Sequence, residues 1–391
     1  MLSPPLSHWQ AAAANTDLLA QASLAKPGNI NAIARLRRNH AHEHVAVALD
    51  LTRARDKAQI KFPACANTLM ADPAGVEQAS SYAVATHKAQ RFIKHKRAQV
   101  IDLCCGIGGD TMALHHAGLN TIAVDHDPVR AWMANQNANA PAVVADAATW
   151  HSPSAALHID PARRTHAGRT HRLADTLPAP DVVSQLIARH AQEGVAVKLS
   201  PAIDRTELAE QLPPGELEFI SESGRLVQAV LWTGGLTTAP PGVRRATRIT
   251  ANAAVHSLHG VADQPAWSEP KQFLFTVDPG LERASLMHLI GLPAIHPKLG
   301  LLTADDDPQS PWLTGFELLE QMPWREKKVR RTLAALDAGV VEVKTRGKAV
   351  DPDQAQRALR GTGKTPFTVF VLRWDRQVVA LITRRLLDAK L

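Results

Sequence analysis

The feature that most constrains the fold is a series of short apolar runs that alternates with helix-like segments from residue 98 onward. Helical patterns at 128–137 and 181–190 lie between such runs. Strands that alternate with helices form a mostly parallel sheet with helices on both faces. The sequence therefore predicts an α/β fold. The runs cover residues 100–105, 121–125, 142–146, 156–160 and 195–199.

Two more apolar runs, 216–221 and 225–232, follow one another across a short turn. They predict neighbouring strands, which would add one antiparallel strand to the sheet. The segment 233–245 is rich in Thr, Pro and Gly and predicts a linker. We therefore expect an α/β core over residues 98–240.

Different patterns flank this core. Residues 1–97 predict a helical region, because apolar residues recur three to four apart over 10–24, 29–38, 42–57 and 82–97. Residues 246–391 predict a small α+β domain, with a helix over 281–289 and a strand–helix–strand–helix–strand pattern from Gly315 onward. The sequence therefore predicts a core between two additional regions.

The charge of the chain is divided along the same lines. The formal net charge is +7. Residues 1–100 carry 13 basic and 6 acidic side chains, residues 101–240 carry 9 and 15, and residues 241–391 carry 22 and 16. The net positive charge excludes an acidic solvating protein and favours a polyanionic partner. The acidic centre between basic flanks indicates that the segments have different roles.

Cysteine usage and the first residues indicate the compartment. Cys65, Cys104 and Cys105 are too few for a disulfide framework and lack metal-ligand spacing. Residues 1–10 lack the basic start and apolar core of a signal peptide, and no apolar run is of transmembrane length. The sequence predicts a reduced, cytoplasmic protein with no metal and no membrane partner.

The most specific motif is the glycine-rich turn D-L-C-C-G-I-G-G-D at 102–110. Glycines there allow the backbone to approach a ligand closely. A dinucleotide fingerprint needs a third glycine at position 111, which is Thr111, and the lysine of a phosphate loop is missing. Asp102, just before the turn, would repel a pyrophosphate but attract a cation such as the sulfonium and amino groups of S-adenosylmethionine.

Two further acids end the next two predicted strands. Asp125 is placed to accept both hydroxyls of an adenosine ribose, and Asp146 could accept the adenine amine. Single acids of this kind usually cap helices or end strands. Acids at successive strand ends, however, meet at the carboxyl edge where open α/β sheets bind ligands. The pattern therefore predicts an S-adenosylmethionine site.

The fourth predicted strand ends in Asp160 and Pro161. The Asp160 carboxylate and the Pro161 carbonyl could accept the two N–H bonds of an exocyclic amine and turn its lone pair toward a methyl group. A turn or helix-capping aspartate is the alternative. We predict Asp160, Pro161 and Arg163 as catalytic. Lys198 could line the same cleft or pair with Asp160, and the sequence does not decide between these.

Basic clusters are the candidate nucleic-acid contacts. Four arginines follow Asp160 within the acidic core, which favours a phosphate-contacting loop, with a solvated turn as the alternative. The segments 324–331 and 344–348 are further candidates, and a solvated surface is the alternative for both. The predicted nucleic-acid residues are Arg163, Arg164, Arg169, Arg172, Lys327, Lys328 and Arg330.

The motifs DLCCGIGGD, VDHDP, VVADA and IDPARR resemble those of class I S-adenosylmethionine-dependent methyltransferases. They are most similar to a bacterial family with a helical N-terminal region and a C-terminal THUMP-like domain, and the glycine motif is similar to that of RNA cap guanine-N2 methyltransferases. The resemblance implies a Rossmann-like core, S-adenosylmethionine as cofactor and a domain type associated with RNA binding. It implies cofactor contacts at Asp102, Cys104, Gly106, Gly108, Asp125, Asp146 and Ala147, and at Gln78 or Ser80.

Three functions remain open from the sequence. The first is methylation of an exocyclic amine of a nucleotide in RNA. The second is methylation of a protein or a small molecule. The third is a non-catalytic RNA-binding module.

Overall fold

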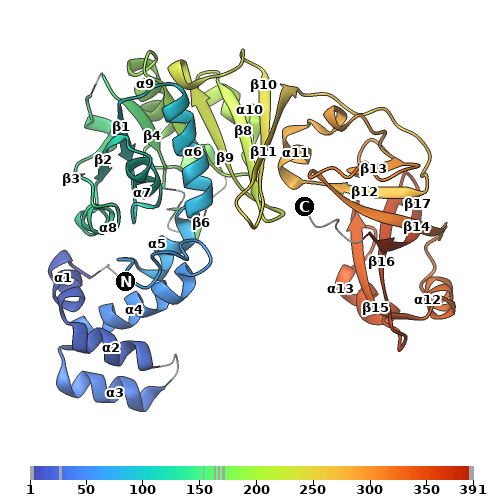
Figure 1. Ribbon diagram of the computed structural model, residues 1–391, viewed down its shortest axis with the longest axis horizontal. Coiled ribbons are helices and arrows are strands. Elements are labelled where there is room, and N and C mark those ends of the chain that lie inside the picture. Colours follow the sequence, from blue (N-terminus) through green and yellow to red (C-terminus); the bar gives the residue numbers. More distant parts are fainter. Residues whose placement is uncertain are drawn as a thin grey trace. The chain divides into compact units, whose positions relative to one another are not determined.

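The computed structural model describes residues 4–25, 29–152, 154–162, 164–165, 168–169 and 172–386. The chain divides into two compact units (Figure 1). The first comprises Met1–Ile220 and Val227–Gly242, and the second comprises Ser221–Leu226 and Val243–Leu391. None of the described helices has the length and apolar character needed to cross a membrane.

The first unit begins with helices, as predicted. Where the periodicity predicted one helix over 10–24, two form, because Asn15 ends the first and its side chain caps the second at Leu18 N (2.9 Å). Packing of apolar side chains such as Leu51 and Phe62 stabilises this region. The helices are α1 (Leu6–Ala14), α2 (Thr16–Leu24), α3 (Ile30–Asn39), α4 (His42–Ala58), α5 (Pro73–Gln78) and α6 (Tyr82–Lys94).

The sheet of the first unit has the strand order β8-β9-β7-β4-β1-β2-β3. The β3, β2, β1, β4 and β7 strands are parallel, and β9 runs antiparallel to β7. The α/β prediction with one antiparallel neighbour is therefore confirmed. The strands are β1 (Gln99–Leu103), β2 (Asn120–Asp125), β3 (Ala142–Val144), β4 (Ala156–Ile159), β7 (Val195–Leu199), β8 (Glu216–Glu222) and β9 (Arg225–Thr233).

The strand order of this sheet reverses at β1, because β2 and β4 lie on its two sides. Ligands of open α/β sheets bind beyond the carboxyl ends of the strands at such a point. Helices α7 (Gly109–His116), α8 (Pro128–Ala138), α9 (Pro180–Arg189) and α10 (Arg205–Gln211) connect or follow the strands. The topology therefore directs a ligand to the turns after β1, β2 and β4.

The turn from β1 into α7 requires glycine at position 108. Gly108 has φ +81°, and an added Cβ would lie 2.7 Å from the Cα of Ala134 in α8. No side chain fits there without moving the backbone of α8. Gly108 therefore allows the glycine turn to pack closely against the neighbouring helix.

The second unit contains the hairpin of β10 (Val243–Ile249) and β11 (Val255–Val261), helix α11 (Pro279–Ala284), and a mixed sheet. That sheet has the order β13-β12-β14-β17-β16-β15. Only its β15–β16 pair is parallel. Its elements are β12 (Phe273–Val277), β13 (Leu301–Ala304), β14 (Leu313–Pro323), α12 (Glu326–Ala335), β15 (Ala338–Arg346), α13 (Pro352–Leu359), β16 (Thr365–Trp374) and β17 (Gln377–Arg385).

The predicted α+β character of the C-terminal region is confirmed, but the helix predicted over 281–289 is shorter. Helix α11 ends at Ala284, and its C-cap residue Ser285 adopts the left-handed conformation (φ 61°). A separate 3-10 turn, Met287–Ile290, follows it. The apolar spacing extended across this break because Leu281 and Leu286 both contribute to the core.

Candidate functional site

A cavity of about 430 Å³ lies at the carboxyl ends of β1, β2, β3 and β4. It coincides with the site that the strand order indicates. Most of the predicted cofactor residues line it, together with the two predicted catalytic residues that the structure describes. The lining includes Gln78, Cys104, Gly106, Asp125, Asp146, Ala147, Asp160 and Pro161.

The wall of this cavity carries a strong excess of negative charge. Its carboxylates are Asp110, Asp125, Asp127, Asp146 and Asp160. Arg130 also lines the cavity, but its guanidinium is held by two hydrogen bonds to Asp72 (2.8 and 2.9 Å). Such a wall repels a pyrophosphate and attracts a cationic ligand. Its charge therefore fits S-adenosylmethionine and disfavours a dinucleotide.

Asp125 is fixed at the end of β2 by the glycine turn. Its Oδ2 accepts a hydrogen bond from Gly106 N (3.0 Å), and its Oδ1 accepts one from Asp127 N (3.0 Å). Gly106 has φ +56°, and a Cβ added to it would meet no other atom within 4 Å. A side chain there would project into the open space of the cavity. The turn thus leaves room for a ligand beside an oriented carboxylate.

The ionisation of Asp125 leads to a testable prediction. Burial raises the pKa of this carboxyl above its ordinary value of 3.8. If the carboxylate holds the cofactor ribose, affinity for S-adenosylmethionine should fall as the pH is lowered, beginning above the pKa of an ordinary aspartate. Calorimetric titrations from neutral pH downward measure this. In Asp125→Asn the affinity should be lower at neutral pH and lack this pH-dependent component, and an identical profile in both proteins would contradict the assignment.

Asp102 does not lie on the cavity wall. Its side chain is fully buried, with Oδ1 2.7 Å from His158 Nδ1 and Oδ2 accepting a 2.5 Å hydrogen bond from Thr111 Oγ1. Gly108 is likewise not among the residues that line the cavity. Asp102 is thus enclosed beneath the glycine turn, and Gly108 packs against α8.

Behind the turn, a buried polar network continues from Asp102 to the cavity. Nζ of Lys88 lies 3.0 Å from His158 Nε2 and 2.6 Å from Asp110 Oδ1. Burial lowers the pKa of Lys88, while Asp110 acts in the opposite direction. Asp110 reaches the cavity, so it joins the buried network to the ligand space.

Lys88 and His158 were not predicted from the sequence. Lys88 lies on the buried face of α6 with Val84, Ala85 and Phe92. A lysine at the apolar spacing of a helix was the available indication, because such a residue needs a buried partner. For His158, the available indication of burial was its position within the apolar run of β4.

Of the two roles that the sequence left open for Lys198, the structure shows the ion pair with Asp160. Lys198, near the end of β7, places Nζ 2.7 Å from Asp160 Oδ2 and donates a second hydrogen bond to the carbonyl of Gln78 (3.0 Å). The Lys198 side chain is 4% exposed. This contact fixes the carboxylate of Asp160 at the strand end and ties it to the segment after α5.

The segment after Asp160 returns to the cavity. Ala162 and Leu177 exchange backbone hydrogen bonds of 2.7 and 3.0 Å, so Leu177 and Pro178 lie on the same wall. Between them, the backbones of β5 (Arg164–Thr165) and β6 (Gly168–Arg169) pair. Arg172 is exposed. The predicted contact Arg163 lies outside the described residues.

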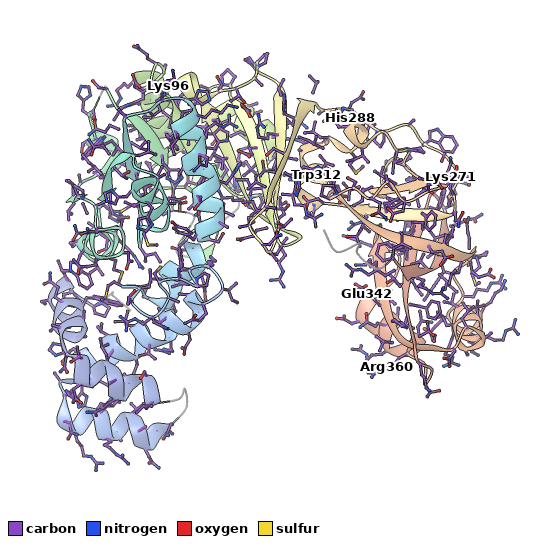
Figure 2. All side chains as sticks on the ribbon, in the orientation of Figure 1. Lys96, Lys271, His288, Trp312, Glu342 and Arg360 are labelled. Carbon is purple, nitrogen blue, oxygen red and sulfur yellow. The ribbon has the colours of Figure 1, made fainter. Side chains whose placement is uncertain are left out.

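The remaining predicted nucleic-acid residues lie in the second unit. Lys327, Lys328 and Arg330 on α12 are exposed, while Val329 and Leu333 of the same helix are buried in the core. On β15, Lys344 forms an ion pair with Glu342 (2.9 Å). Glu342 is labelled in Figure 2. The exposed cations of α12 therefore remain the better candidates for phosphate contacts.

Comparisons with known proteins agree with this geometry. Residues 313–385 match a family model described as THUMP domain-like. An uncharacterised S-adenosylmethionine-dependent methyltransferase of Mycobacterium tuberculosis, found in two strains, is 34% identical over 307 residues, which cover 76% of this chain and 83% of the relative. A solved structure of a candidate methyltransferase from Porphyromonas gingivalis is similar in fold (TM-score 0.72, 18% identity), covering 95% of this chain and 98% of its own.

Proposed function

The chain belongs to the S-adenosylmethionine-dependent methyltransferases, and we propose that it methylates an exocyclic amine of a nucleotide in RNA. The observation that carries the proposal is that Asp160 and Pro161 line the same cavity as the acids suited to the cofactor. The acceptor site and the cofactor site would therefore share one space.

The residues of the cavity fit the cofactor at its adenosine end. Asp125 would accept the ribose hydroxyls, and Asp146, with Ala147 beside it, would lie at the adenine. S-adenosylmethionine, when bound, supplies an electrophilic methyl group. The task left to the protein is to align a nucleophile with that group and to exclude other geometries.

An amine suits the part of the cavity that Asp160 and Pro161 line, because both residues offer hydrogen-bond acceptors. Lys198 holds Oδ2 of Asp160, and Oδ1 is the second acceptor of the same carboxylate. This oxygen and the carbonyl of Pro161 would each accept one N–H of the amine. With both N–H bonds held, the nitrogen lone pair is directed out of the amine plane toward the methyl group.

Two features support RNA as the substrate class. The THUMP-like match covers most of the mixed sheet of the second unit, and the exposed cations of α12 lie within it. Protein contacts with nucleic acids are dominated by basic side chains on phosphates. The basic cluster after Asp160 would add contacts beside the reacting amine.

The α12 cations yield a testable prediction. Replacing Lys327, Lys328 and Arg330 together with alanine should weaken RNA binding and flatten the dependence of log Kd on log salt by about two to three units of slope. The charge-conserving set Lys327→Arg, Lys328→Arg and Arg330→Lys is the control and should keep the wild-type slope. Equal slopes for the alanine variant and the wild type would remove α12 from the RNA interface.

Transfer of label identifies the substrate class. The protein is incubated with S-adenosylmethionine carrying a labelled methyl group and with separated RNA, protein and small-molecule fractions. These fractions come from cells that lack the protein. Label in RNA supports the proposal. Label in protein or small molecules supports the second function considered above. A protein that binds RNA and cofactor but labels no fraction would favour the non-catalytic module.

A further inference from the structure

Leu177 is a large apolar side chain that is exposed on the wall of the cavity. It lines the cavity together with Asp160 and Pro161, and the residue is 65% exposed. A single exposed leucine on an outer surface is ordinary in a folded protein. On the wall of a concave site, however, an apolar side chain adds to the surface that a ligand covers. The position of Leu177 therefore indicates a contact with a bound molecule.

Backbone contacts place Leu177 beside the predicted acceptor residues. Leu177 N donates a hydrogen bond to the carbonyl of Ala162 (3.0 Å), and Ala162 N donates one to the carbonyl of Leu177 (2.7 Å). Opposite residues of an antiparallel pair carry their side chains on the same face. Leu177 thus stands next to Ala162, which also lines the cavity and directly follows Asp160 and Pro161 in the chain.

The strand order separates this position from the acids suited to the adenosine. Asp125 ends β2 and Asp146 follows β3, and both strands lie on the far side of β1 from β4. Leu177 is paired with the segment that follows β4. Its side chain is therefore placed at the part of the cavity that holds Asp160, away from the part suited to the adenosine.

The segment that leads to Leu177 is anchored to the protein. Leu173 and Thr176 are buried, and Thr176 Oγ1 donates a hydrogen bond to the carbonyl of Leu173 (2.9 Å). Ala174 N donates one to Oε1 of Glu207 in α10 (3.1 Å). A side chain that extends from an anchored backbone loses less conformational freedom when a ligand binds. Leu177 is therefore exposed on a fixed support.

The chemistry of the wall limits what Leu177 can contact. The Asp160 carboxylate and the Pro161 carbonyl accept hydrogen bonds, whereas Leu177 offers an aliphatic surface without polar atoms. Among the described residues that line the cavity there is no Phe, Tyr or Trp. A base that has left its stack is held by hydrogen bonds at its edge and by aromatic or apolar side chains on its faces. This wall suits a group that is polar at its edge and apolar on its face.

We propose that Leu177 contacts the flat face of the acceptor nucleobase and thereby selects a planar amine. The inference rests on the proposed function, because it takes the acceptor to be a nucleotide of RNA. A base whose two amine N–H bonds are held by Asp160 and Pro161 is not paired with another strand. Contact with Leu177 would replace part of the stacking that such a base loses. An aliphatic amine has no flat face to make this contact.

Steady-state methyl transfer tests the contact. The substrate is total RNA from cells that lack the protein, and the rate is measured against RNA concentration. Leu177→Ala should raise the apparent KM about tenfold and change kcat by no more than about threefold, because it removes apolar contact but no group that orients the amine. Leu177→Met should keep KM within about twofold, since methionine offers a similar apolar surface.

Leu24→Ala is the matched control. Leu24 in α2 is also exposed (82%), but it is not among the residues that line the cavity. Its replacement should leave KM within about twofold of the wild-type value. Equal KM values for Leu177→Ala and Leu24→Ala would overturn the inference while RNA methylation holds.

Cofactor calorimetry on the same proteins separates the two possible contacts of Leu177. The affinity of Leu177→Ala for S-adenosylmethionine should remain within about twofold of the wild-type value. A tenfold loss would assign Leu177 to the cofactor and overturn the inference. Absence of label from RNA with the wild-type protein would instead overturn the proposed function, and this inference with it, so the two failures are distinguishable.

Discussion

Replacement of Asp160 with alanine is expected to lower kcat about 10²- to 10³-fold, while affinity for S-adenosylmethionine changes by no more than about twofold. The reason is that Asp160 would orient the amine and make no essential contact with the cofactor. Its carboxylate lies at the end of β4, where Lys198 holds one oxygen at 2.7 Å. The measurements are single-turnover methyl transfer to RNA and cofactor calorimetry on the same preparation.

Lys198→Met tests whether the orientation of Asp160, and not only its presence, affects kcat. It retains the length of the side chain but removes the donor to Asp160 and to the Gln78 carbonyl. We expect an intermediate loss of kcat, partly restored by Lys198→Arg, because the arginine can still donate to the carboxylate. Wild-type kcat in Asp160→Ala would exclude an orienting role for this residue.

Lys88→Met is expected to lower the free energy of unfolding by about 3–5 kcal/mol, the largest stability effect of the changes considered. Lys88 is 1% exposed and contacts Asp110, His158 and Ser80. Methionine fills similar volume but leaves the Asp110 carboxylate buried without its cation. Urea denaturation followed by circular dichroism measures the change.

Lys94→Met on the same helix is the control for this variant. Lys94 is exposed at the end of α6, so its replacement should change the unfolding free energy by no more than about 0.5 kcal/mol. A small effect of Lys88→Met, similar to that of Lys94→Met, would mean that the buried network contributes little to stability.

The strand ends of the core could be predicted from sequence. Asp125, Asp146 and Asp160 each end or directly follow an apolar run, and the carboxyl ends of parallel strands meet at one edge. The structure brings all three to one cavity. This inference needed only the alternation of elements and no knowledge of side-chain contacts.

Asp102 shows where such reasoning stops. It lies inside β1, one residue before the strand ends, so its side chain points to one face of the sheet instead of beyond the edge. In the parallel register it stands beside His158 of β4. Lys88, which contacts His158, comes from α6, a helix that precedes the core. The spacing along α6 indicates that Lys88 is buried, but it does not indicate which residue Lys88 contacts.

The sequence likewise does not show whether Asp110 or Asp102 lines the cavity. Both acids flank the glycine turn, and their spacing in the sequence is compatible with a role for either. Only the three-dimensional arrangement shows that Asp102 is enclosed while Asp110 lines the cavity. The place of Asp110 on the cavity wall therefore required the structure.

Nucleoside mass spectrometry of total RNA tests the central claim most directly. RNA is compared between cells with the protein, cells without it, and cells that carry only Asp160→Ala. The account predicts that one nucleoside methylated on an exocyclic amine is present in the first and missing from the other two. Identical modified nucleosides in all three, with methyl label entering protein or small molecules, would contradict it.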